Sequence, residues 1–341
     1  MSKKPLILGI ESSCDETAAS LITENEEGFP VVLSNIVSSQ VEVHKEFGGV
    51  VPELAARSHI EKIDWIVKKA IDESGRKIEE IDAVASTAGP GLIVCLSVGL
   101  SFGKAFATAM NKPFIAVNHL EGHALSPKLN SNLNYPYLLL LISGGHSQYL
   151  SVQNLGKYKR LGTTIDDALG EAFDKTAKLL GIEFPGGPQI EILAKKGDPE
   201  KYDLPKPIFS KGGCNLSFAG LKTAVLKISK TIKSEQDKYD LAASFQKTIE
   251  EILYKKTKIA FTEFEKINKL NEKIFVVAGG VAANKKIRSM LINLCEENNY
   301  KSIFPPIEFC GDNAAMIAMV GLEKFKLNQF NNLDYPAKPR W

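Results

Sequence analysis

Two histidines four residues apart are the chain's clearest candidates for metal chemistry. His119 and His123 lie in the segment NHLEGH at 118–123. Side chains four residues apart on a helix project from one face, so both imidazoles could reach a single ion. Glutamate stands two residues after His119 rather than next to it, so the H-E-x-x-H motif of zinc peptidases is missing. The alternative interpretation is two partly buried histidines at the end of a helix.

Asp312 is the candidate third ligand. It stands in the segment GDN at 311–313, directly before an apolar stretch at 314–322 that predicts a helix. It could be the N-cap of that helix, a common role for aspartate, or a carboxylate ligand beside His119 and His123. Two histidines and one carboxylate suit Fe²⁺ with open coordination positions, and Zn²⁺ is also compatible. A metal needs such open positions if it is to contact a substrate oxygen.

Three glycine pairs are candidates for holding a phosphate, because glycine lets the backbone lie close against a ligand. The first pair, in SGGH at 143–146, follows a predicted strand. The second, in PGGP at 185–188, predicts a rigid open turn, and the third, in GGVAAN at 279–284, predicts the start of a helix. Each pair could be an ordinary turn, but three of them at the ends of elements favour a nucleotide site.

Two common nucleotide motifs are missing. The stretch GLSFGK at 99–104 lacks one spacer residue of a P-loop and is followed by Ala105, so we expect it in the interior of a helix. No G-x-G-x-x-G motif follows a strand, and a Rossmann site is therefore not supported.

The elements that must position these residues recur along the chain. A strand, a polar turn and a second strand are predicted twice, about 130 residues apart. A strand, a glycine turn and a helix are also predicted twice. The first pattern predicts strands at 6–10, 18–23, 137–142 and 148–152; the second predicts strands at 81–86 and 274–277 and helices at 92–110 and 282–295. Amphipathic helices are expected at 53–74 and around 241–264, and irregular backbone after Leu327. The pattern predicts a duplicated α/β architecture.

The composition is that of a folded, reduced protein of about two domains. The chain has 341 residues, 44% of them hydrophobic, and a formal net charge of +2, which argues against a protein that coats nucleic acid. Its five cysteines include no C-x-x-C pair, so disulfides and a cysteine zinc site are not expected. The apolar run at 6–10 meets Glu11 at once and predicts a strand rather than a signal peptide. We therefore expect a cytoplasmic protein without a membrane span.

The motifs, taken in order, resemble those of the universal tRNA threonylcarbamoyladenosine transferases, formerly called O-sialoglycoprotein endopeptidases. The resemblance covers essentially the whole chain and includes GIESSCDET at 9–17, NHLEGH at 118–123, SGGH at 143–146, GEAFDK at 170–175, PGGP at 185–188, GGV at 279–281 and GDN at 311–313. Ser147 stands where threonine is common in the family.

The resemblance implies an actin-like, sugar-kinase-like α/β fold of two ribonuclease-H-like lobes with a cleft between them. We expect the first lobe at residues 1–130 plus 308–341 and the second at 131–307. The resemblance further implies that the threonylcarbamoyl group of threonylcarbamoyl-AMP is transferred to an adenosine of tRNA. The acceptor is the N6 amine of the adenosine 3′ of the anticodon, at tRNA position 37, in tRNAs that read codons beginning with adenine.

The family's site residues carry over by position. One Fe²⁺ per subunit, with Zn²⁺ possible, is implied at His119, His123 and Asp312. The implied donor-binding residues are Leu141, Ile142, Ser143, Gly144, Gly145, Asp174, Gly187, Glu191 and Asn284. The implied partners are tRNA, a non-catalytic paralogue (TsaB-like) and a small ATPase (TsaE-like).

In such a reaction AMP is a good leaving group and the adenine amine a weak nucleophile. Catalysis then depends on positioning and on neutralising charge at the leaving phosphate. We hypothesise that Asp15 or Glu16 orients the acceptor or takes its proton. The alternative is that both are turn residues or lie behind the metal ligands. His146 is a weaker candidate for a donor contact.

Three other functions fit parts of the pattern. A metallopeptidase would use the same three ligands but needs a general base, and an ATPase or phosphotransferase of this fold would turn over ATP alone. A binding-only scaffold would have no need for the complete ligand set. Lysines at 222, 227, 230, 233, 255, 256 and 258 could line an RNA-binding face, although such charges are commonly a solvated helix surface.

Overall fold

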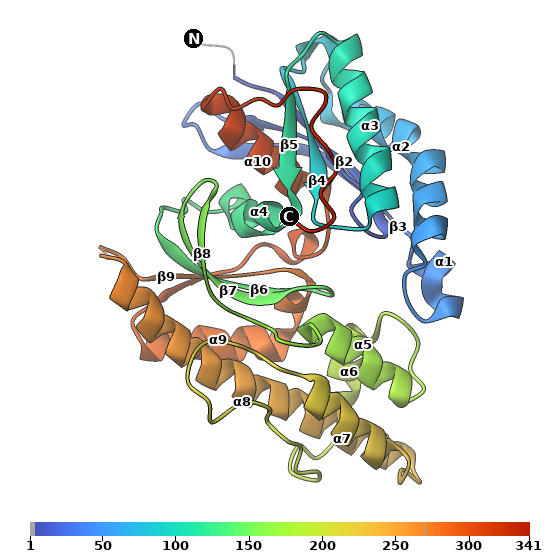
Figure 1. The fold of residues 1–341 in the computed structure, drawn as a ribbon, viewed down its shortest axis with the longest axis vertical. Helices are drawn as coiled ribbons and strands as arrows, with labels where there is room; N and C mark the ends of the chain where they lie inside the picture. The colour runs from blue at the N-terminus through green and yellow to red at the C-terminus, as the bar shows by residue number, and fades with distance from the viewer. Residues whose placement is uncertain (1–3, 270) are drawn as a thin grey trace. The chain divides into compact units, whose positions relative to one another are not determined.

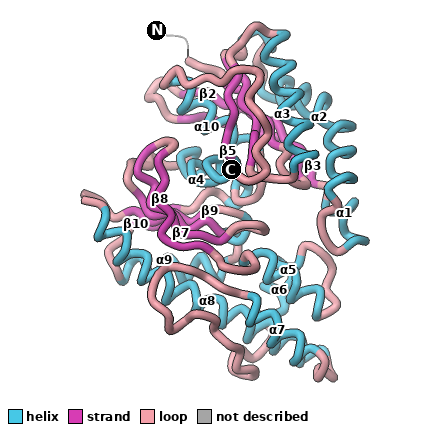
Figure 2. The backbone as a smooth tube through the Cα atoms, viewed as in Figure 1, coloured by secondary structure: helices cyan, strands magenta, loops and turns pink. Residues whose placement is uncertain are grey.

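The computed structural model describes residues 4–269 and 271–341, which divide into two compact units. Unit 1 consists of the chain up to Leu133 together with Gly311–Trp341, and unit 2 is Asn134–Cys310. Each unit has its own five-stranded mixed sheet. The strands of both sheets can be followed in Figures 1 and 2. Among the described residues, no helix has the length and apolar character needed to cross a bilayer.

Unit 1 is built on the sheet β3-β2-β1-β4-β5. Its strands are β1 (Ile7–Glu11), β2 (Glu16–Glu24), β3 (Pro30–Ser39), β4 (Ala83–Gly89) and β5 (Phe114–Asn118). Its α-helices are α1 (Val41–His44), α2 (Pro52–Ser74), α3 (Ile93–Ala109), α4 (His119–Leu125) and α10 (Ala314–Lys326), with short 3₁₀ turns η1 (Lys45–Phe47), η2 (Ile78–Glu80) and η3 (Ser126–Leu129).

Unit 2 is built on the sheet β10-β9-β6-β7-β8. Its strands are β6 (Tyr137–Ile142), β7 (Ser147–Asn154), β8 (Lys157–Thr163), β9 (Ile274–Ala278) and β10 (Lys301–Ile303). Its α-helices are α5 (Leu169–Leu179), α6 (Gly186–Ala194), α7 (Ala219–Ser229), α8 (Glu235–Ile267) and α9 (Lys285–Glu297), with 3₁₀ turns η4 (Gly280–Ala283) and η5 (Ile307–Phe309).

The two sheets share one topology, which confirms the predicted duplication. In unit 1 the strand β1 runs antiparallel to β2 and parallel to β4, which is parallel to β5. In unit 2 the strand β6 runs antiparallel to β7 and parallel to β9, which is parallel to β10. In each unit, therefore, the carboxyl ends of three parallel strands meet at one edge of the sheet, the usual place for a ligand site in such folds.

Alternation along β1 packs different helices on the two faces of the first sheet. Leu8 and Ile10 belong to a buried apolar cluster that includes Ile66 of α2 and Leu100 of α3. On the other face, Gly9 lies under α10, where a Cβ atom would be only 2.6 Å from the Ala318 nitrogen. The missing side chain at Gly9 thus lets α10 lie directly on the sheet.

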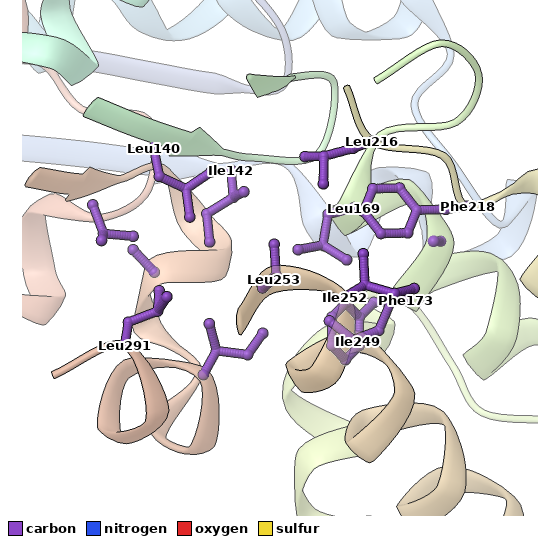
Figure 3. Close-up of a cluster of buried hydrophobic side chains, with 14 of the residues drawn as sticks. Leu140, Ile142, Leu169, Phe173, Leu216, Phe218, Ile249, Ile252, Leu253 and Leu291 are labelled. Carbon is purple, nitrogen blue, oxygen red and sulfur yellow. The ribbon is translucent and has the colours of Figure 1, made fainter. Parts of the chain in front are cut away.

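A single apolar cluster joins the sheet of unit 2 to its helices (Figure 3). Leu140 and Ile142 of β6 point into it, and Phe173 of α5 and Ile249 of α8 belong to the same cluster. The long helix α8 contributes a stripe of buried residues at helical spacing, as its sequence pattern predicts. This cluster fixes the end of β6, from which the first glycine pair follows.

The structure corrects two local predictions. The glycine pair at 279–280 opens the 3₁₀ turn η4, and α9 begins only at Lys285, because the Asn284 side chain caps it by accepting a hydrogen bond from the Ile287 N–H at 3.0 Å. Residues 186–188, predicted to be a turn, form the first turn of α6. Proline is compatible with that position because the first N–H groups of a helix have no partner within it.

The segment after Leu327 contains no helix or strand, as predicted, but it is fastened to unit 1. The Asn331 N–H donates to the Phe114 carbonyl at 2.8 Å, and the Lys338 N–H donates to the Ala88 carbonyl at 2.7 Å. The sequence did not reveal β3, β5, β8 and β10, which are the four outer strands of the two sheets. Several residues of β3 and β8 are only partly buried, so alternation was weak, and β5 and β10 are short.

Candidate active site

The two histidines extend from a helix that begins where β5 ends. Asn118 closes the strand and caps α4, its side-chain oxygen accepting hydrogen bonds from the N–H groups of Leu120 and Glu121 at 2.8 and 3.2 Å. This cap makes His119 the first residue of α4 and places His123 one turn later on the same face. Both imidazoles are buried, and their ring centroids are 4.8 Å apart.

Asp312 reaches the same place from the loop before α10. Its Oδ1 atom lies 3.1 Å from Nε2 of His123 and 3.5 Å from Nε2 of His119. One ligand atom from each residue lies within 4.8 Å of the others. The alternative role for Asp312 is wrong, because Asn313 is the helix cap and accepts from the Met316 N–H at 3.0 Å.

Close packing of α4 on α10 allows this convergence. A Cβ atom at Gly122 would lie 3.0 Å from Cδ1 of Ile317 and 3.2 Å from Cγ of Met316. A larger residue at Gly122 would therefore push α4 away from α10 and separate the imidazoles from Asp312.

Glu11 stands behind His119 and was not among the residues singled out from the sequence. Its Oε2 atom lies 3.1 Å from Nδ1 of His119 and accepts a hydrogen bond from the Thr87 hydroxyl at 2.6 Å. Its Oε1 atom accepts from the Ser13 N–H. A carboxylate on the outer nitrogen of a histidine is the usual support for a metal ligand. The available signal was a carboxylate at the carboxyl end of a buried strand.

The electrostatics favour a cation at this place. Burial raises the pKa of Asp312, but His119 and His123 outweigh it and hold that pKa well below its usual range. Burial lowers the pKa of His119, but the carboxylates of Asp312 and Glu11 outweigh it and raise that pKa well above its usual value. The ionised Asp312 carboxylate and the two imidazoles, with Glu11 behind His119, therefore make a set of donors that fits Fe²⁺ or Zn²⁺.

His123 adds an observation of its own. Its Nδ1 atom is buried and has no hydrogen-bond partner among the described residues. Its Nε2 atom, by contrast, is the nitrogen that faces Asp312. The nitrogen of His123 that has a partner is therefore the one that faces Asp312, within the group of candidate metal ligands.

Asp15, in the turn between β1 and β2, and Glu16, the first residue of β2, lie close to this group. Burial raises the pKa of the Glu16 carboxyl, and the nearby carboxylates of Asp312 and Asp15 raise it further, to well above its usual range. The Asp15 carbonyl accepts a hydrogen bond from the Gln40 N–H at 3.0 Å. Both acidic residues thus belong to the surroundings of the metal ligands.

The first and third glycine pairs lie side by side in unit 2, because β6 and β9 are parallel neighbours. Leu141 pairs with Ala278 in register, and Ile142 is the last residue of β6. Gly279 has φ of 95°, and a Cβ atom there would lie 2.4 Å from the Ile142 carbonyl oxygen. Gly144 and Gly145 are exposed, and a Cβ atom on either would meet nothing within 4 Å. A ligand could therefore lie flat on this turn.

The second glycine pair joins the group through α5. Asp174 accepts a hydrogen bond from the Gly186 N–H at 2.7 Å, so its carboxylate caps the first turn of α6. Gly170, at the start of α5, donates its N–H to the Ser143 carbonyl at 3.1 Å. This contact holds the start of α5 against the exposed glycine turn. Because Asp174 of α5 in turn caps α6, Gly187 at the start of α6 is connected to the same turn.

Glu191 and Asn284 connect α6 with α9. The Glu191 carboxylate accepts from the Lys285 N–H at 3.1 Å, and the Asn284 amide donates to Gln246 of α8 at 3.0 Å. All the donor-binding positions implied by the resemblance thus lie in unit 2, around the carboxyl ends of β6 and β9. Asp15, Glu16 and the three metal ligands lie in unit 1.

Comparison with known proteins identifies the family. A family model described as tRNA N6-adenosine threonylcarbamoyltransferase matches residues 31–319. The protein of that name from Pelagibacter ubique (strain HTCC1062) is 81% identical over 341 residues, covering 100% of this chain and 96% of the relative. The chain belongs to the tRNA N6-adenosine threonylcarbamoyltransferase family. Another member, from Rickettsia conorii (strain ATCC VR-613 / Malish 7), is 54% identical over 338 residues, covering 98% of this chain and 97% of the relative.

Solved structures confirm the fold class expected for this threonylcarbamoyltransferase family member. HypF from T. kodakarensis matches with a TM-score of 0.64 and 14% identity, covering 97% of this chain and 49% of that one. Component A of (R)-2-hydroxyglutaryl-CoA dehydratase from Acidaminococcus fermentans matches with a TM-score of 0.52 and 14% identity, covering 94% and 98%. At these identities the likeness concerns the fold alone, which is the actin-like, sugar-kinase-like α/β class.

Proposed function

We propose that this protein transfers the threonylcarbamoyl group of threonylcarbamoyl-AMP to the N6 amine of adenosine 37 in tRNAs that read codons beginning with adenine. The observation that carries the proposal is membership of the threonylcarbamoyltransferase family over the whole chain, together with the His119, His123 and Asp312 group. We assign the site residues from the positions in this sequence that match the family's motifs. The metallopeptidase and ATPase alternatives have no comparable support.

The donor would be held in unit 2. The exposed Gly144–Gly145 turn and the Gly187 N–H at the start of α6 are available to the phosphate of the adenylate, since Asp174 already binds the Gly186 N–H and Pro188 has none. Leu141, Ile142, Ser143, Asp174, Gly187, Glu191 and Asn284 would complete the donor site. The Asp174 cap of α6 keeps the Gly187 N–H in place before the donor arrives, and the bond from Asn284 to the first turn of α9 fixes the Asn284 side chain.

The metal site would belong to His119, His123 and Asp312, with Glu11 orienting His119 through its outer nitrogen. A bound Fe²⁺, or Zn²⁺, would supply Lewis acidity toward a substrate oxygen. Asp15 or Glu16 would orient the acceptor or take its proton. The raised pKa of Glu16 supports a role in holding or moving a proton.

The partners are proposed from the family resemblance. They are tRNA, a non-catalytic paralogue and a small ATPase, and the place of action is the cytoplasm. The net charge of +2 argues against broad attraction to nucleic acid, so we expect tRNA to be bound by a local surface.

Reconstitution tests the proposal. The protein, threonylcarbamoyl-adenylate and unmodified tRNA are incubated with and without a chelator, and the tRNA nucleosides are analysed by mass spectrometry. We expect the modified adenosine only in the reactions without chelator, and its loss in His119→Ala. Full transfer by His119→Ala would remove the metal from the mechanism, and peptide cleavage or ATP turnover by the protein alone would favour the other functions.

A further inference from the structure

Unit 1 contains a row of buried hydrogen bonds that ends on the segment carrying Asp15 and Glu16. It passes through His44, Gln40 and His59, none of which contacts the three metal ligands in a hydrogen bond. Both histidines are fully buried, at 0% exposure, and Gln40 is 1% exposed. Burying three polar side chains together is costly unless each is satisfied, so their arrangement calls for a role.

The bonds run in one direction. The Val51 N–H donates to Nδ1 of His44 at 3.3 Å, and Nε2 of His44 then donates to Oε1 of Gln40, also at 3.3 Å. Nε2 of Gln40 donates to Nδ1 of His59 at 3.3 Å, and Nε2 of His59 donates to the Cys14 carbonyl at 3.0 Å. A backbone N–H can only donate and a carbonyl can only accept, so the two ends fix the proton of each ring on Nε2.

Further contacts hold the same segment. The Thr17 hydroxyl lies 2.7 Å from Nδ1 of His59, and the Gln40 N–H donates to the Asp15 carbonyl at 3.0 Å. Burial lowers the pKa of His59, which agrees with a neutral ring that accepts at Nδ1. The segment from Cys14 to Thr17 is therefore held by three contacts: two to its backbone carbonyls, at Cys14 and Asp15, and one to the Thr17 side chain.

The metal ligands are fastened differently. His119 is held at Nδ1 by Glu11 and by the Ser13 hydroxyl, each at 3.1 Å. Loss of the His59 contact would therefore free the Cys14 carbonyl while leaving the hydrogen bonds of His119 in place. The backbone of Asp15 would then be held by its bond to Gln40, and that of Glu16 by its strand pairing with Ser39.

We propose that His59 is a positioning residue for the transfer reaction, whose Nε2–H group holds the Cys14 carbonyl and so keeps Asp15 and Glu16 beside the metal centre. This inference rests on the proposed function, since it assigns a place in that reaction to a residue outside the metal and donor sites. The acceptor adenosine is the substrate whose orientation it controls.

Two substitutions of His59 by amide residues distinguish this positioning role from a merely structural one. His59→Gln puts an amide nitrogen near the position of Nε2 and keeps a donor for the Cys14 carbonyl, whereas His59→Asn puts its amide near Nδ1 and cannot reach that carbonyl. Glu61→Gln, on the exposed side of the same helix, is the matched control. Each variant is measured for melting temperature, bound metal per chain, kcat, and KM for the adenylate and for tRNA.

We expect His59→Asn to lower kcat about 100-fold, the loss typical of a reacting group misplaced by about 1 Å, with metal content and adenylate KM unchanged. His59→Gln should recover most of that loss, and ¹⁵N NMR of the wild type should show His59 protonated at Nε2. Equal activity of His59→Asn and wild type, or equal losses in both amides together with loss of metal, would overturn the proposal.

A second variant decides the matter if His59→Asn does not fold. Thr17→Val keeps the shape of a strand residue but removes the hydroxyl that orients the His59 ring. A lowered kcat with full metal content supports the positioning role, and wild-type kcat contradicts it. Wild-type protein is assayed in parallel, alone and with the paralogue and ATPase; its failure to modify tRNA would count against the proposed function rather than against His59.

Discussion

Oε2 of Glu11 lies 3.1 Å from Nδ1 of His119, and this contact turns the opposite nitrogen of the ring toward Asp312. The two residues are 108 positions apart in the sequence. Because β1, β4 and β5 are parallel neighbours, the end of β1 and the start of α4 come together at one edge of the sheet. The metal ligand is thus oriented by a residue from another strand.

Replacing Glu11 tests this support. Glu11→Gln removes the charge behind His119 but keeps the size of the side chain, so we expect metal affinity to fall about 10- to 100-fold, as for other residues behind metal ligands. Titration calorimetry with Zn²⁺ or with Fe²⁺ under nitrogen measures the change. The exposed Asp334→Asn, in the same unit, is the control, and wild-type affinity in Glu11→Gln would contradict the assigned role.

Replacing Asp312 tests the ligand itself. Asp312→Asn leaves the cap of α10 intact, because Asn313 supplies it. We therefore expect a folded protein with little change in melting temperature and without stoichiometric metal. Elemental analysis after purification and a chelator-free thermal shift with added metal measure the outcome; full metal content in the folded variant would remove Asp312 from the site.

Metal affinity should depend on pH with a defined sign. The pKa of His119 is raised well above 6.5, because the carboxylates of Asp312 and Glu11 outweigh the effect of burial. A metal must displace that proton, so affinity should rise about tenfold per pH unit through and above neutral pH and level off above the raised pKa. Calorimetry in buffers of different ionisation enthalpy counts the released proton. A pH-independent affinity between pH 6 and 8 would show that His119 binds no proton there.

Substitutions at two glycines should distinguish an effect on folding from an effect on nucleotide binding. Gly279→Ala puts a Cβ atom 2.4 Å from the Ile142 carbonyl at a φ of 95°, and we expect a loss of stability on the order of 1–3 kcal/mol. Gly144→Ala meets nothing within 4 Å, so it should keep the wild-type melting temperature.

Its effect should be seen in binding, because the added methyl group stands where the phosphate must approach the backbone. We expect AMP affinity to fall at least about tenfold, or about 1.4 kcal/mol. Gly156→Ala is a control for added bulk on an exposed turn with open space, although its φ of 69° will itself lower stability slightly. Unchanged AMP affinity in Gly144→Ala would place the nucleotide elsewhere.

The sequence by itself determined the local parts of this protein. The spacing of His119 and His123 and the cap at Asn118 are properties of a few neighbouring residues, and helical periodicity gave α2 and α3 within one residue at either end. The glycine pairs were also visible, because glycine marks places where the backbone must bend or be approached. Patterns of this kind depend on local sterics, which are written into short segments.

Only the tertiary structure decided which of these parts meet. Asp312 stands 189 positions from His123, and their 3.1 Å contact depends on α4 packing closely on α10 at Gly122. Likewise, the contacts of Glu11 depend on strand order, and those of His59 depend on its burial beside the turn between β1 and β2. Periodicity shows which face of an element is buried but not what it is buried against, and that choice comes from how the strands and helices of the whole unit pack.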